Sequence, residues 1–334
     1  MLTSELEYEL PQGLIAQCPA EPRDASRLMV LDARRETITH HAFRDLPRFL
    51  GAEDALVLNE TKVIPARLRA RKPSGGEVEL LFLRDLGCGG AWEVLARPSR
   101  RLRPGLRLSA GDEDLQILES LGGGHWAVTA PDVRGLLERG GRMPLPPYIR
   151  ATRDTEGRYQ TVYARNAGSA AAPTAGLHFT EAVLEEVERA GARVARVTLH
   201  VGVGTFVPVR SERLEEHRMH AEYYSVPKEA ARTLEGARRV VAAGTTVART
   251  LETWAATGEP EGDSTLFVYP GYRWRSVDAL LTNFHLPRST LLAMVMSFAG
   301  KDLVREAYRV AVEERYRFYS FGDAMLLLNG GRTP

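Results

Sequence analysis

Residues 76–96 read GEVELLFLRDLGCGGAWEVLA and decide the fold class of this 334-residue chain. Two β-rich pieces of strand length are separated here by a turn that contains three glycines. Further short pieces of the same kind follow at similar spacing, a pattern that predicts a small sandwich or barrel. The expected strands are Glu77–Leu83, Ala91–Ala96, Leu106–Ser109, Leu115–Glu119 and His125–Thr129.

Strand-like and helix-like segments alternate outside this region, which indicates an α/β domain. The proline-rich stretch Arg142–Tyr148 is stiff and suits a linker that returns the chain to that domain. We therefore expect a discontinuous α/β domain, residues 1–65 and 148–334, interrupted by an inserted β-barrel domain, residues 66–147. Its expected strands are Arg27–Asp32, Ala55–Asn59, Val194–His200, Tyr223–Val226, Arg239–Ala243 and Leu266–Tyr269. Its expected helices are Thr180–Ala190, Pro227–Arg238, Thr246–Ala256, Ser289–Ala299 and Asp302–Tyr316.

The composition excludes several classes of protein. Hydrophobic residues make up 44% of the chain, enough for a sizeable core. The net charge is +1, so nothing global indicates a nucleic-acid or membrane protein. Cys18 and Cys88 are far apart and lack a metal-ligand spacing, which indicates a reducing compartment and no structural zinc. No secretory signal or bilayer-length apolar run is visible, so we expect a cytoplasmic protein with no membrane partner.

Two glycine-containing motifs are candidates for a ligand site. Pro173–Phe179 (PTAGLHF) ends where a helix is expected, so its backbone N–H groups can close on a ligand beside His178. The alternative is a turn with a capping histidine. His200–Phe206 (HVGVGTF) leaves a strand and places Gly202 and Gly204 where a side chain would block close approach of a ligand. A β-bulge explains this second motif equally well.

Two further motifs combine histidine with a carboxylate or an amide. His217–Glu222 (HRMHAE) has histidines at positions i and i+3 and a carboxylate at i+5. A metal site is conceivable, but no other ligand has a convincing spacing, so hydrogen bonding or acid–base chemistry is favoured. Asn283–Pro287 (NFHLP) sets an amide and an imidazole in apolar surroundings, where both need partners. They form either a satisfied core pair or a pair that recognises a base or ribose.

The four motifs together are more informative than any one of them. Five of the eight histidines fall within them, at positions 178, 200, 217, 220 and 285. Imidazoles titrate near neutrality, so a site rich in histidine suits proton transfer to and from a leaving group. The clustering predicts one active site assembled from the second half of the chain.

A local excess of positive charge lies in the expected barrel. Lys62–Arg107 contains eleven Lys/Arg against four Asp/Glu. A solvated basic face is one explanation. Contact with nucleic-acid phosphates is the other, because such contacts position a nucleic acid without reading its bases.

With these segments in view, the chain resembles the S-adenosylmethionine:tRNA ribosyltransferase-isomerase family of queuosine biosynthesis, from Tyr8 almost to Leu328. Many long blocks in one order carry the resemblance. Besides the four motifs, they are Pro22–Leu28 (PRDASRL), Leu58–Leu68 (LNETKVIPARL), Gly141–Ile149 (GRMPLPPYI), Tyr159–Tyr163 (YQTVY), Gly244–Thr246 (GTT), Tyr269–Gly271 (YPG) and Tyr316–Met325 (YRFYSFGDAM). Glu60 departs from the family pattern, which usually has Asp there, and Met296 departs from a usual Ser-Ala-Phe-Ala-Gly run.

The resemblance implies an α/β fold with β-barrels, in which the larger catalytic domain is of the α/β barrel type. It also implies that the ribosyl part of S-adenosylmethionine is transferred to an aminomethyl-deazaguanine at the anticodon wobble position of tRNA. Epoxyqueuosine forms, and adenine and methionine are released. S-adenosylmethionine is then a consumed co-substrate, no metal is needed, the anticodon arm of tRNA is the partner, and a monomer is expected.

Residue roles follow from the same resemblance combined with the chemistry of the motifs. His178 and His285 lead as general base and acid, with Glu222 and Asp323 as competing carboxylates. Arg210 or Arg249 would bind a carboxylate or phosphate. The remaining residues expected to shape the S-adenosylmethionine pocket are Thr174, Gly176, His200, Gly202, Gly204, Thr205 and Asn283. The residues expected to contact tRNA are Arg67, Arg97, Arg100, Arg101 and Arg103.

Two other functions compete with this interpretation. A conventional methyltransferase with a Rossmann-like core would need a Gly-rich turn after its first strand, whereas His200–Phe206 comes late in the chain. A tRNA-binding module without catalysis would explain the basic barrel but not the histidine-rich motifs.

Overall fold

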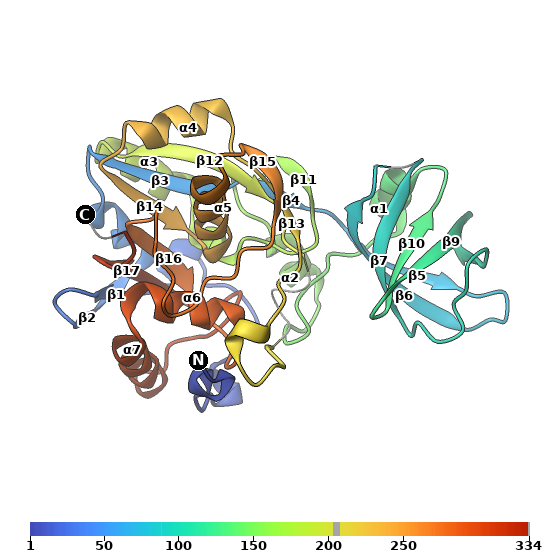
Figure 1. The fold of residues 1–334 in the computed structure, drawn as a ribbon, viewed down its shortest axis with the longest axis horizontal. Helices are drawn as coiled ribbons and strands as arrows, with labels where there is room; N and C mark the ends of the chain where they lie inside the picture. The colour runs from blue at the N-terminus through green and yellow to red at the C-terminus, as the bar shows by residue number, and fades with distance from the viewer. Residues whose placement is uncertain (88, 203–207, 333–334) are drawn as a thin grey trace.

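Two bodies joined by two chain crossings make up the fold (Figure 1). This computed structural model describes residues 1–87, 89–202 and 208–332. Within them the chain forms a closed six-stranded barrel, a nine-stranded mixed sheet flanked by helices, and a small two-stranded sheet. The expected fold class, α/β with a β-barrel inserted into a larger domain, is confirmed. The larger sheet has β15 and β2 at its two ends.

The barrel contains one strand that the sequence pattern did not reveal. Strand β5 (Arg67–Arg71) reads RLRAR, and its arginines obscure the buried Leu68 and Ala70, which face inward at alternate positions. Helix α1 (Val133–Gly140) packs Leu136 and Leu137 against the barrel core. The other strands are β6 (Glu77–Asp85), β7 (Ala91–Arg97), β8 (Arg107–Ala110), β9 (Glu113–Gly122) and β10 (His125–Thr129). The antiparallel order β10-β7-β6-β5-β8-β9 closes through the β9–β10 pair.

The chain enters and leaves the barrel at adjacent points. The N–H of Arg67 donates to the carbonyl of Arg142 at 3.1 Å, and the N–H of Arg142 donates to the carbonyl of Arg67 at 2.8 Å. Gly141 fits here because it lacks a side chain, since a Cβ would lie 2.0 Å from the carbonyl oxygen of Pro65. The two crossings are therefore held together as a pair. The domain boundaries predicted at 65/66 and 147/148 lie close to this pair.

The large sheet has parallel strands at its centre. Its order is β15-β13-β12-β3-β14-β16-β17-β1-β2, and β12, β3, β14 and β16 run parallel to their neighbours within this group. Strand β3 is buried along its whole length, as expected for a central parallel strand. The strands are β1 (Arg27–Asp32), β2 (Thr37–Ala42), β3 (Asp54–Asn59), β12 (Arg193–Leu199), β13 (Glu222–Ser225), β14 (Arg239–Ala243), β15 (Glu261–Ser264), β16 (Ala279–Asn283) and β17 (Ala324–Leu328). The small sheet pairs β4 (Thr61–Val63) with β11 (Asn166–Ser169).

Helices cover both faces of the large sheet. Leu56 and Leu58 of β3 pack in the cluster that includes α3, whereas Ala55 and Val57 pack in the cluster that includes α4, α5, α6 and α7. The helices are α2 (Arg153–Arg158), α3 (Glu181–Arg189), α4 (Lys228–Glu235), α5 (Thr245–Thr257), α6 (Thr290–Ala299) and α7 (Lys301–Glu313). Short 3-10 turns are η1 (Thr3–Leu6), η2 (Gln12–Leu14), η3 (Arg23–Ala25), η4 (Phe43–Phe49), η5 (Thr174–His178) and η7 (Leu214–Glu216).

One expected strand is wrong. Leu266–Tyr269 is not a strand, and the neighbouring ladder is β15 instead. The N–H of Leu266 donates to Oγ of Ser264 at 3.4 Å, so the backbone turns away from the sheet directly after β15. Leu266, Phe267 and Val268 are apolar because they pack against the large hydrophobic core, not because they pair with a strand.

Candidate active site

Four strands deliver polar segments to one edge of the large sheet. Because β12, β3, β14 and β16 are parallel, their carboxyl ends meet at this edge. Asn59 ends β3, His200 follows β12, Gly244 follows β14 and Asn283 ends β16. Two of the four predicted motifs begin here as a direct result of the topology.

An inner cavity opens at this edge, with about 590 Å³ of empty space, part of it open to solvent. Three predicted motifs contribute to its wall, through Thr174, Val201 and the segment 283–286. A smaller side pocket shares Thr245 and Thr246 with the cavity and adds Glu222 from the remaining motif. All four segments therefore meet around one site. The other residues that line the inner cavity include Tyr148, Phe284, Leu286, Ser289, Leu291, Tyr319 and Ser320.

Asn283 lines the inner cavity and carries an unpaired acceptor. Its amide nitrogen donates to Nε2 of His178 at 3.0 Å and to the carbonyl of Tyr319 at 3.1 Å. Because a carbonyl can only accept, the nitrogen must face Tyr319, which fixes the position of Oδ1. Asn283 is 2% exposed, and Oδ1 has no hydrogen-bond partner among the described residues. A buried acceptor of this kind requires a donor, which a ligand can supply.

His178 is held inside the protein behind Asn283. Because its Nε2 accepts from Asn283, the proton lies on Nδ1, which donates to Oγ of Ser26 at 2.8 Å. The ring also stacks on Phe43 with 5.0 Å between centroids. Burial, aided by two nearby arginines, lowers the pKa of His178 to about 3. Its neutral ring orients the amide of Asn283, and His178 does not line any of the described cavities.

His285 does line the inner cavity. Its Nε2 lies 2.8 Å from Oγ1 of Thr282, and the described residues give Nδ1 no hydrogen bond. Its backbone is fixed on both sides, because its N–H donates to the Tyr308 hydroxyl and its carbonyl accepts from the Tyr8 hydroxyl. Burial lowers the pKa of His285 to about 3, so the imidazole is unprotonated at neutral pH.

The amino end of α5 also opens into the inner cavity. Gly244 precedes this helix with φ of 109°, a conformation that favours glycine, and no side chain caps the helix. Thr245 and Thr246 line the cavity, and the free N–H groups of a helix amino end attract carboxylates and phosphates. These residues belong to a block that resembles the family, but they were not predicted as site residues. Their one signal in the sequence is a glycine directly before a helix.

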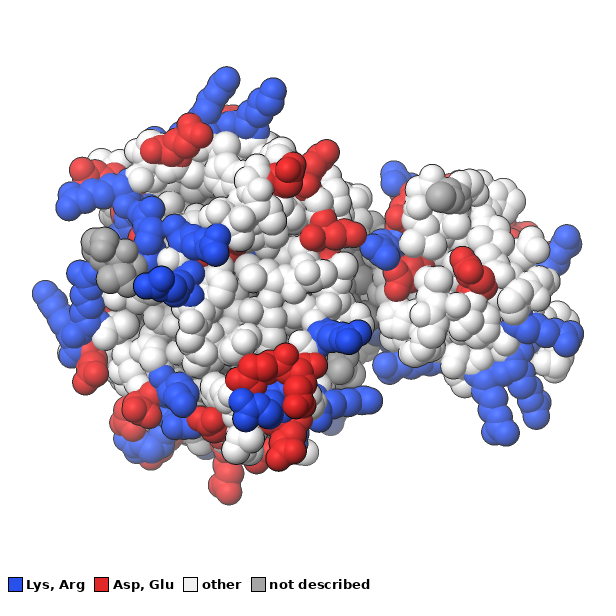
Figure 2. All heavy atoms as spheres, viewed as in Figure 1, with Lys and Arg blue, Asp and Glu red and all other residues white. Residues whose placement is uncertain are grey.

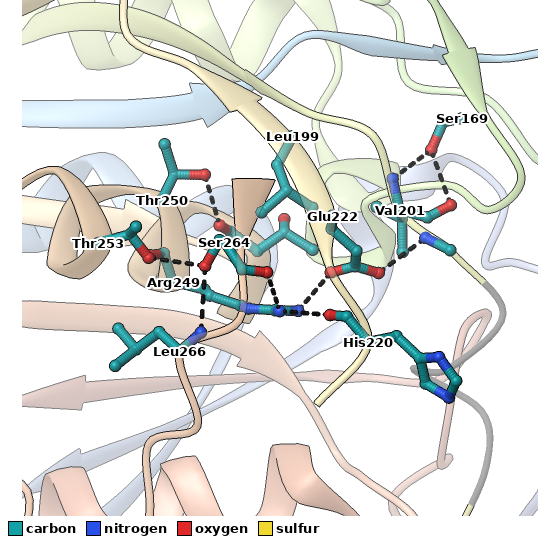
Figure 3. A network of polar contacts seen from close by, with 12 residues as sticks. Ser169, Leu199, Val201, His220, Glu222, Arg249, Thr250, Thr253, Ser264 and Leu266 are labelled. Atoms are coloured by element: carbon teal, nitrogen blue, oxygen red, sulfur yellow. Dashed lines mark hydrogen bonds and ion pairs between the residues drawn. The ribbon is translucent and has the colours of Figure 1, made fainter. Parts of the chain in front are cut away.

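Glu222 is engaged through both carboxylate oxygens (Figure 3). Oε2 pairs with Nη1 of Arg249, and Oε1 accepts the N–H of Gly202 at 2.7 Å. Nη2 of Arg249 donates to the carbonyls of His220 at 2.9 Å and of Ser264 at 2.6 Å. This network ties α5 to β13, β15 and the chain after β12. Arg249, predicted to bind a ligand carboxylate or a phosphate, has its charge compensated by Glu222 within the protein.

A second, larger hollow lies between the barrel and the larger body and is called the interdomain cleft below. It contains about 2000 Å³ of empty space, part of it open to solvent. Two residues predicted for the S-adenosylmethionine pocket, His200 and Gly202, line this cleft instead of the inner cavity. Glu222 lines both the cleft and the side pocket of the inner cavity. It therefore stands in the wall that separates the two hollows.

The other predicted pocket and catalytic residues are dispersed. Gly176 packs under Tyr163, whose hydroxyl would lie 2.2 Å from an added Cβ. Asp323 accepts backbone N–H bonds from Arg27 and Arg317, and so anchors the start of β17. Arg210 is exposed. Gly204 and Thr205 lie outside the described residues.

The predicted tRNA-binding arginines fall into two groups. Arg67 is half-buried, pairs with Glu79 at 2.9 Å and donates to the carbonyl of Leu145 at 3.2 Å, so it fastens the linker to the barrel. The other group is exposed at the end of β7 and on the segment between β7 and β8, and Figure 2 shows Lys and Arg side chains gathered at the outer end of the barrel. This group, called the barrel arginines below, consists of Arg97, Arg100, Arg101 and Arg103.

The metal site that His217–Glu222 left conceivable finds no support. The ring of His217 packs against Phe267 at 5.3 Å, and Glu222 pairs with Arg249. Among residues 1–87, 89–202 and 208–332, no group of three or more His, Cys, Asp or Glu side chains is arranged to hold a metal ion. In the same ranges, no helix combines the length and apolar character required to cross a bilayer.

Known proteins are similar to this chain in sequence and fold. The sequence profile of a family described as "Queuosine biosynthesis protein" matches residues 3–327. The S-adenosylmethionine:tRNA ribosyltransferase-isomerase of Rubrobacter xylanophilus is 72% identical over 100% of this chain and 99% of its own length. The enzyme of the same name from Moorella thermoacetica is 52% identical over 98% of this chain and 100% of its own. The crystal structure of the S-adenosylmethionine tRNA ribosyltransferase from Thermotoga maritima superposes with a TM-score of 0.57 at 42% identity, covering 97% of this chain and 100% of that one. With its motifs gathered at one edge of the sheet and these relatives matched along their whole length, the chain belongs to the S-adenosylmethionine:tRNA ribosyltransferase-isomerase family of queuosine biosynthesis proteins.

Proposed function

We propose that this enzyme transfers and isomerises the ribosyl part of S-adenosylmethionine onto the aminomethyl-deazaguanine at the wobble position of tRNA. Epoxyqueuosine-tRNA forms, with release of adenine and methionine. The observation that carries the proposal is the unpaired Oδ1 of Asn283 in a cavity whose wall is formed by three of the four predicted motifs, with the fourth at its side pocket. The family membership supports the choice of reaction.

The inner cavity fits S-adenosylmethionine as a consumed co-substrate. The amino end of α5, at Thr245 and Thr246, offers N–H groups to the methionine carboxylate. Oδ1 of Asn283 accepts from an amino group of the ligand, and Phe284 and Leu291 supply apolar surface for its uncharged parts. The residues present therefore match a ligand that carries a carboxylate, amino groups and an apolar sulfonium arm.

The reaction requires proton transfer at two points. A base removes a proton from the ribose carbon beside the sulfonium, the ring opens, and adenine leaves with a proton from a general acid. The amine of the deazaguanine then attacks the sugar, and a sugar oxygen closes the epoxide as methionine departs. His285 is our leading candidate for these transfers because it lines the inner cavity, and Glu222, which lines the side pocket but is held by Arg249 and Gly202, is the second. His178 and Asp323 are positioning residues in this proposal, because their polar atoms are bonded within the protein and neither side chain lines the described cavities.

The product assay distinguishes this function from its competitors. The protein is incubated with S-adenosylmethionine and tRNA that carries the aminomethyl base, and the small products are separated by chromatography. Adenine and methionine in equal amounts support ribosyl transfer. S-adenosylhomocysteine would mean methyl transfer instead, and the absence of any turnover would leave a binding protein. Unmodified tRNA is the control and should release neither adenine nor methionine.

The tRNA partner, the cellular location and the oligomeric state belong to the same proposal. The substrate is the anticodon arm of tRNA, which places the enzyme in the cytoplasm, and the barrel arginines contact the tRNA backbone. The enzyme acts as a monomer, since the described residues bring the candidate groups of the site together within one chain. Light scattering coupled to size-exclusion chromatography should give a mass close to 37.0 kDa. A mass twice as large at assay concentration would contradict the monomer.

A further inference from the structure

The interdomain cleft has one wall from each body. Leu83, Trp92 and His125 lie on the barrel side, and His200 and Tyr223 lie on the larger body. Contacts cross it at two places, because Arg84 approaches Asp263 at 3.5 Å and the ring of His125 stacks on that of His220 with 6.2 Å between centroids. The cleft is therefore a defined space with polar and aromatic walls. Its empty volume is more than three times that of the inner cavity.

An exposed aromatic platform stands in this cleft. Tyr223 is 41% exposed, and its ring stacks on His200 with 5.8 Å between centroids and 25° between planes. The His200 ring is held by a 2.8 Å bond from Nδ1 to Thr61, and the Tyr223 hydroxyl donates to Glu261 at 3.2 Å. A planar ring fixed from behind and uncovered in front is the surface on which proteins stack unpaired nucleobases.

The charge of the cleft is opposite to that of the outer barrel. Its lining has three basic residues, Lys62, Arg84 and Arg134. Against them stand five acidic residues, Asp85, Glu93, Glu138, Glu222 and Asp263. Figure 2 shows acidic and basic side chains side by side at the notch between the bodies, whereas basic side chains predominate at the outer end of the barrel. Because Arg249 compensates Glu222, four acidic residues remain against the three basic ones. A cleft with this excess favours a cationic group over a phosphate.

Glu222 places the cleft next to the inner cavity. It lines the cleft on one side and the side pocket with Thr245, Thr246 and Arg249 on the other. Gly202 closes the same wall by donating its N–H to Glu222. A base held in the cleft therefore lies next to a ligand held in the inner cavity.

We propose that the interdomain cleft receives the target nucleotide of tRNA, splayed out of its stack, with the base on Tyr223 and its aminomethyl ammonium among the carboxylates. The identity of the base rests on the proposed function. The stacking surface and the preference for a cation are inferred from the residues of the cleft alone. The barrel arginines then hold backbone phosphates outside the cleft, while Asp263 selects the cationic base within it.

The test measures binding in the absence of S-adenosylmethionine. Fluorescence anisotropy compares two anticodon stem-loop RNAs whose wobble base carries either an aminomethyl group or a neutral hydroxymethyl group. The wild-type protein should prefer the aminomethyl RNA. Asp263→Asn should reduce that preference by about threefold to tenfold, the effect of about 1 kcal/mol. Asp112→Asn removes an exposed acid of the barrel that does not line the cleft and should leave the preference unchanged.

A second pair of variants tests the aromatic platform. Tyr223→Ala should weaken binding of both RNAs by at least about fivefold, the low end of base–aromatic stacking, whereas Tyr223→Phe should retain it. Val162→Ala, which removes an exposed apolar side chain outside the cleft, is the control. Equal affinity of the wild-type protein for both RNAs, together with no effect of Tyr223→Ala, overturns the cleft proposal while leaving ribosyl transfer intact. Missing adenine and methionine in the product assay overturns the proposed function, and the binding experiment still decides whether the cleft takes a cationic base.

Discussion

His178 and His285 both have a pKa of about 3 but differ in what surrounds their rings. His178 has both nitrogens bonded inside the protein, whereas the described residues engage only Nε2 of His285. The sequence placed both in histidine motifs but could not separate their roles. The difference depends on Ser26, which is 152 positions from His178; it lies in the block Pro22–Leu28, but nothing in that block predicts a contact with His178.

Replacement of His285 tests its contact with the ligand. His285→Ala should slow turnover by at least about a hundredfold if His285 moves a proton, the low end of general acid–base catalysis. His41→Ala is the control, because this ring packs on Phe49 outside the described cavities. Steady-state release of adenine is the measurement. A loss of less than tenfold would remove His285 from the proton-transfer step and leave Glu222 as the candidate.

The low pKa of the buried histidines predicts acid sensitivity. The unfolded chain binds a proton at each histidine below a pKa of about 6.5, whereas the folded protein does not until about pH 3. Stability is therefore lost as the pH falls below 6.5. Between pH 7 and 5 each histidine should lower the free energy of unfolding by about 2 kcal/mol. Urea denaturation across this range measures the slope.

The matched variant for this prediction is His285→Gln. It keeps a polar side chain but cannot titrate. It should therefore decrease the dependence of the free energy of unfolding on pH by the contribution of one histidine. Val162→Ala, at an exposed residue that does not titrate, is the control and should leave the slope close to that of the wild type. An unchanged slope in His285→Gln would show that this imidazole is protonated alike in the folded and unfolded states.

At the scale of elements, the sequence predicted the strands and helices whose apolar residues are spaced according to which faces are buried. The apolar run Ala55–Leu58 predicts β3 because a central parallel strand is buried on both faces. Strand β2 (TITHHA) was missed because it lies at the sheet edge and buries little. Leu266–Tyr269 was predicted as a strand because packing against a core and pairing in a sheet both favour a run of apolar and aromatic residues. Only long-range contacts, which a pattern does not contain, distinguish these cases.

The ion pair between α5 and β13 is buried on both sides, so the loss of one partner is costly. Arg249→Met should lower the free energy of unfolding by about 3–5 kcal/mol, because it leaves Glu222 buried without its counter-charge. The double variant Glu222→Gln/Arg249→Met should recover part of that loss. Arg309→Met removes an exposed arginine that pairs with Glu306 and Glu313, and it should stay close to the wild type. Equal midpoints for the Arg249 and Arg309 variants in chemical denaturation would contradict a structural role for the pair.

At the scale of the whole molecule, charge is sorted between two surfaces that the composition hides. The net charge of +1 averages the basic outer barrel and the acidic cleft. Local counting along the sequence predicts the first surface, because its four arginines lie within seven residues of one another. It does not predict the second, whose acids come from segments as distant as Asp85 and Asp263 and meet only through the arrangement of the two bodies.

Reversing the barrel arginines should weaken tRNA binding through its electrostatic part. The triple variant Arg100→Glu, Arg101→Glu, Arg103→Glu should lower affinity and reduce the slope of log Kd against log salt by about 2 to 3, close to one unit per lost phosphate contact. The matched control reverses Arg189, Arg305 and Arg309, which are exposed on the larger body. Filter binding over a salt series gives the slope. The same slope in both triple variants would mean that the barrel arginines are only a solvated face.

The paired crossings at Arg67 and Arg142 bear on how such a protein arises. Because the chain leaves the larger body and returns at adjacent points, the barrel occupies the position of an enlarged loop. A gene segment inserted or exchanged at that loop would leave the large sheet with its strand order intact. Selection can therefore remodel the barrel, the body that we propose contacts tRNA, without rebuilding the inner cavity.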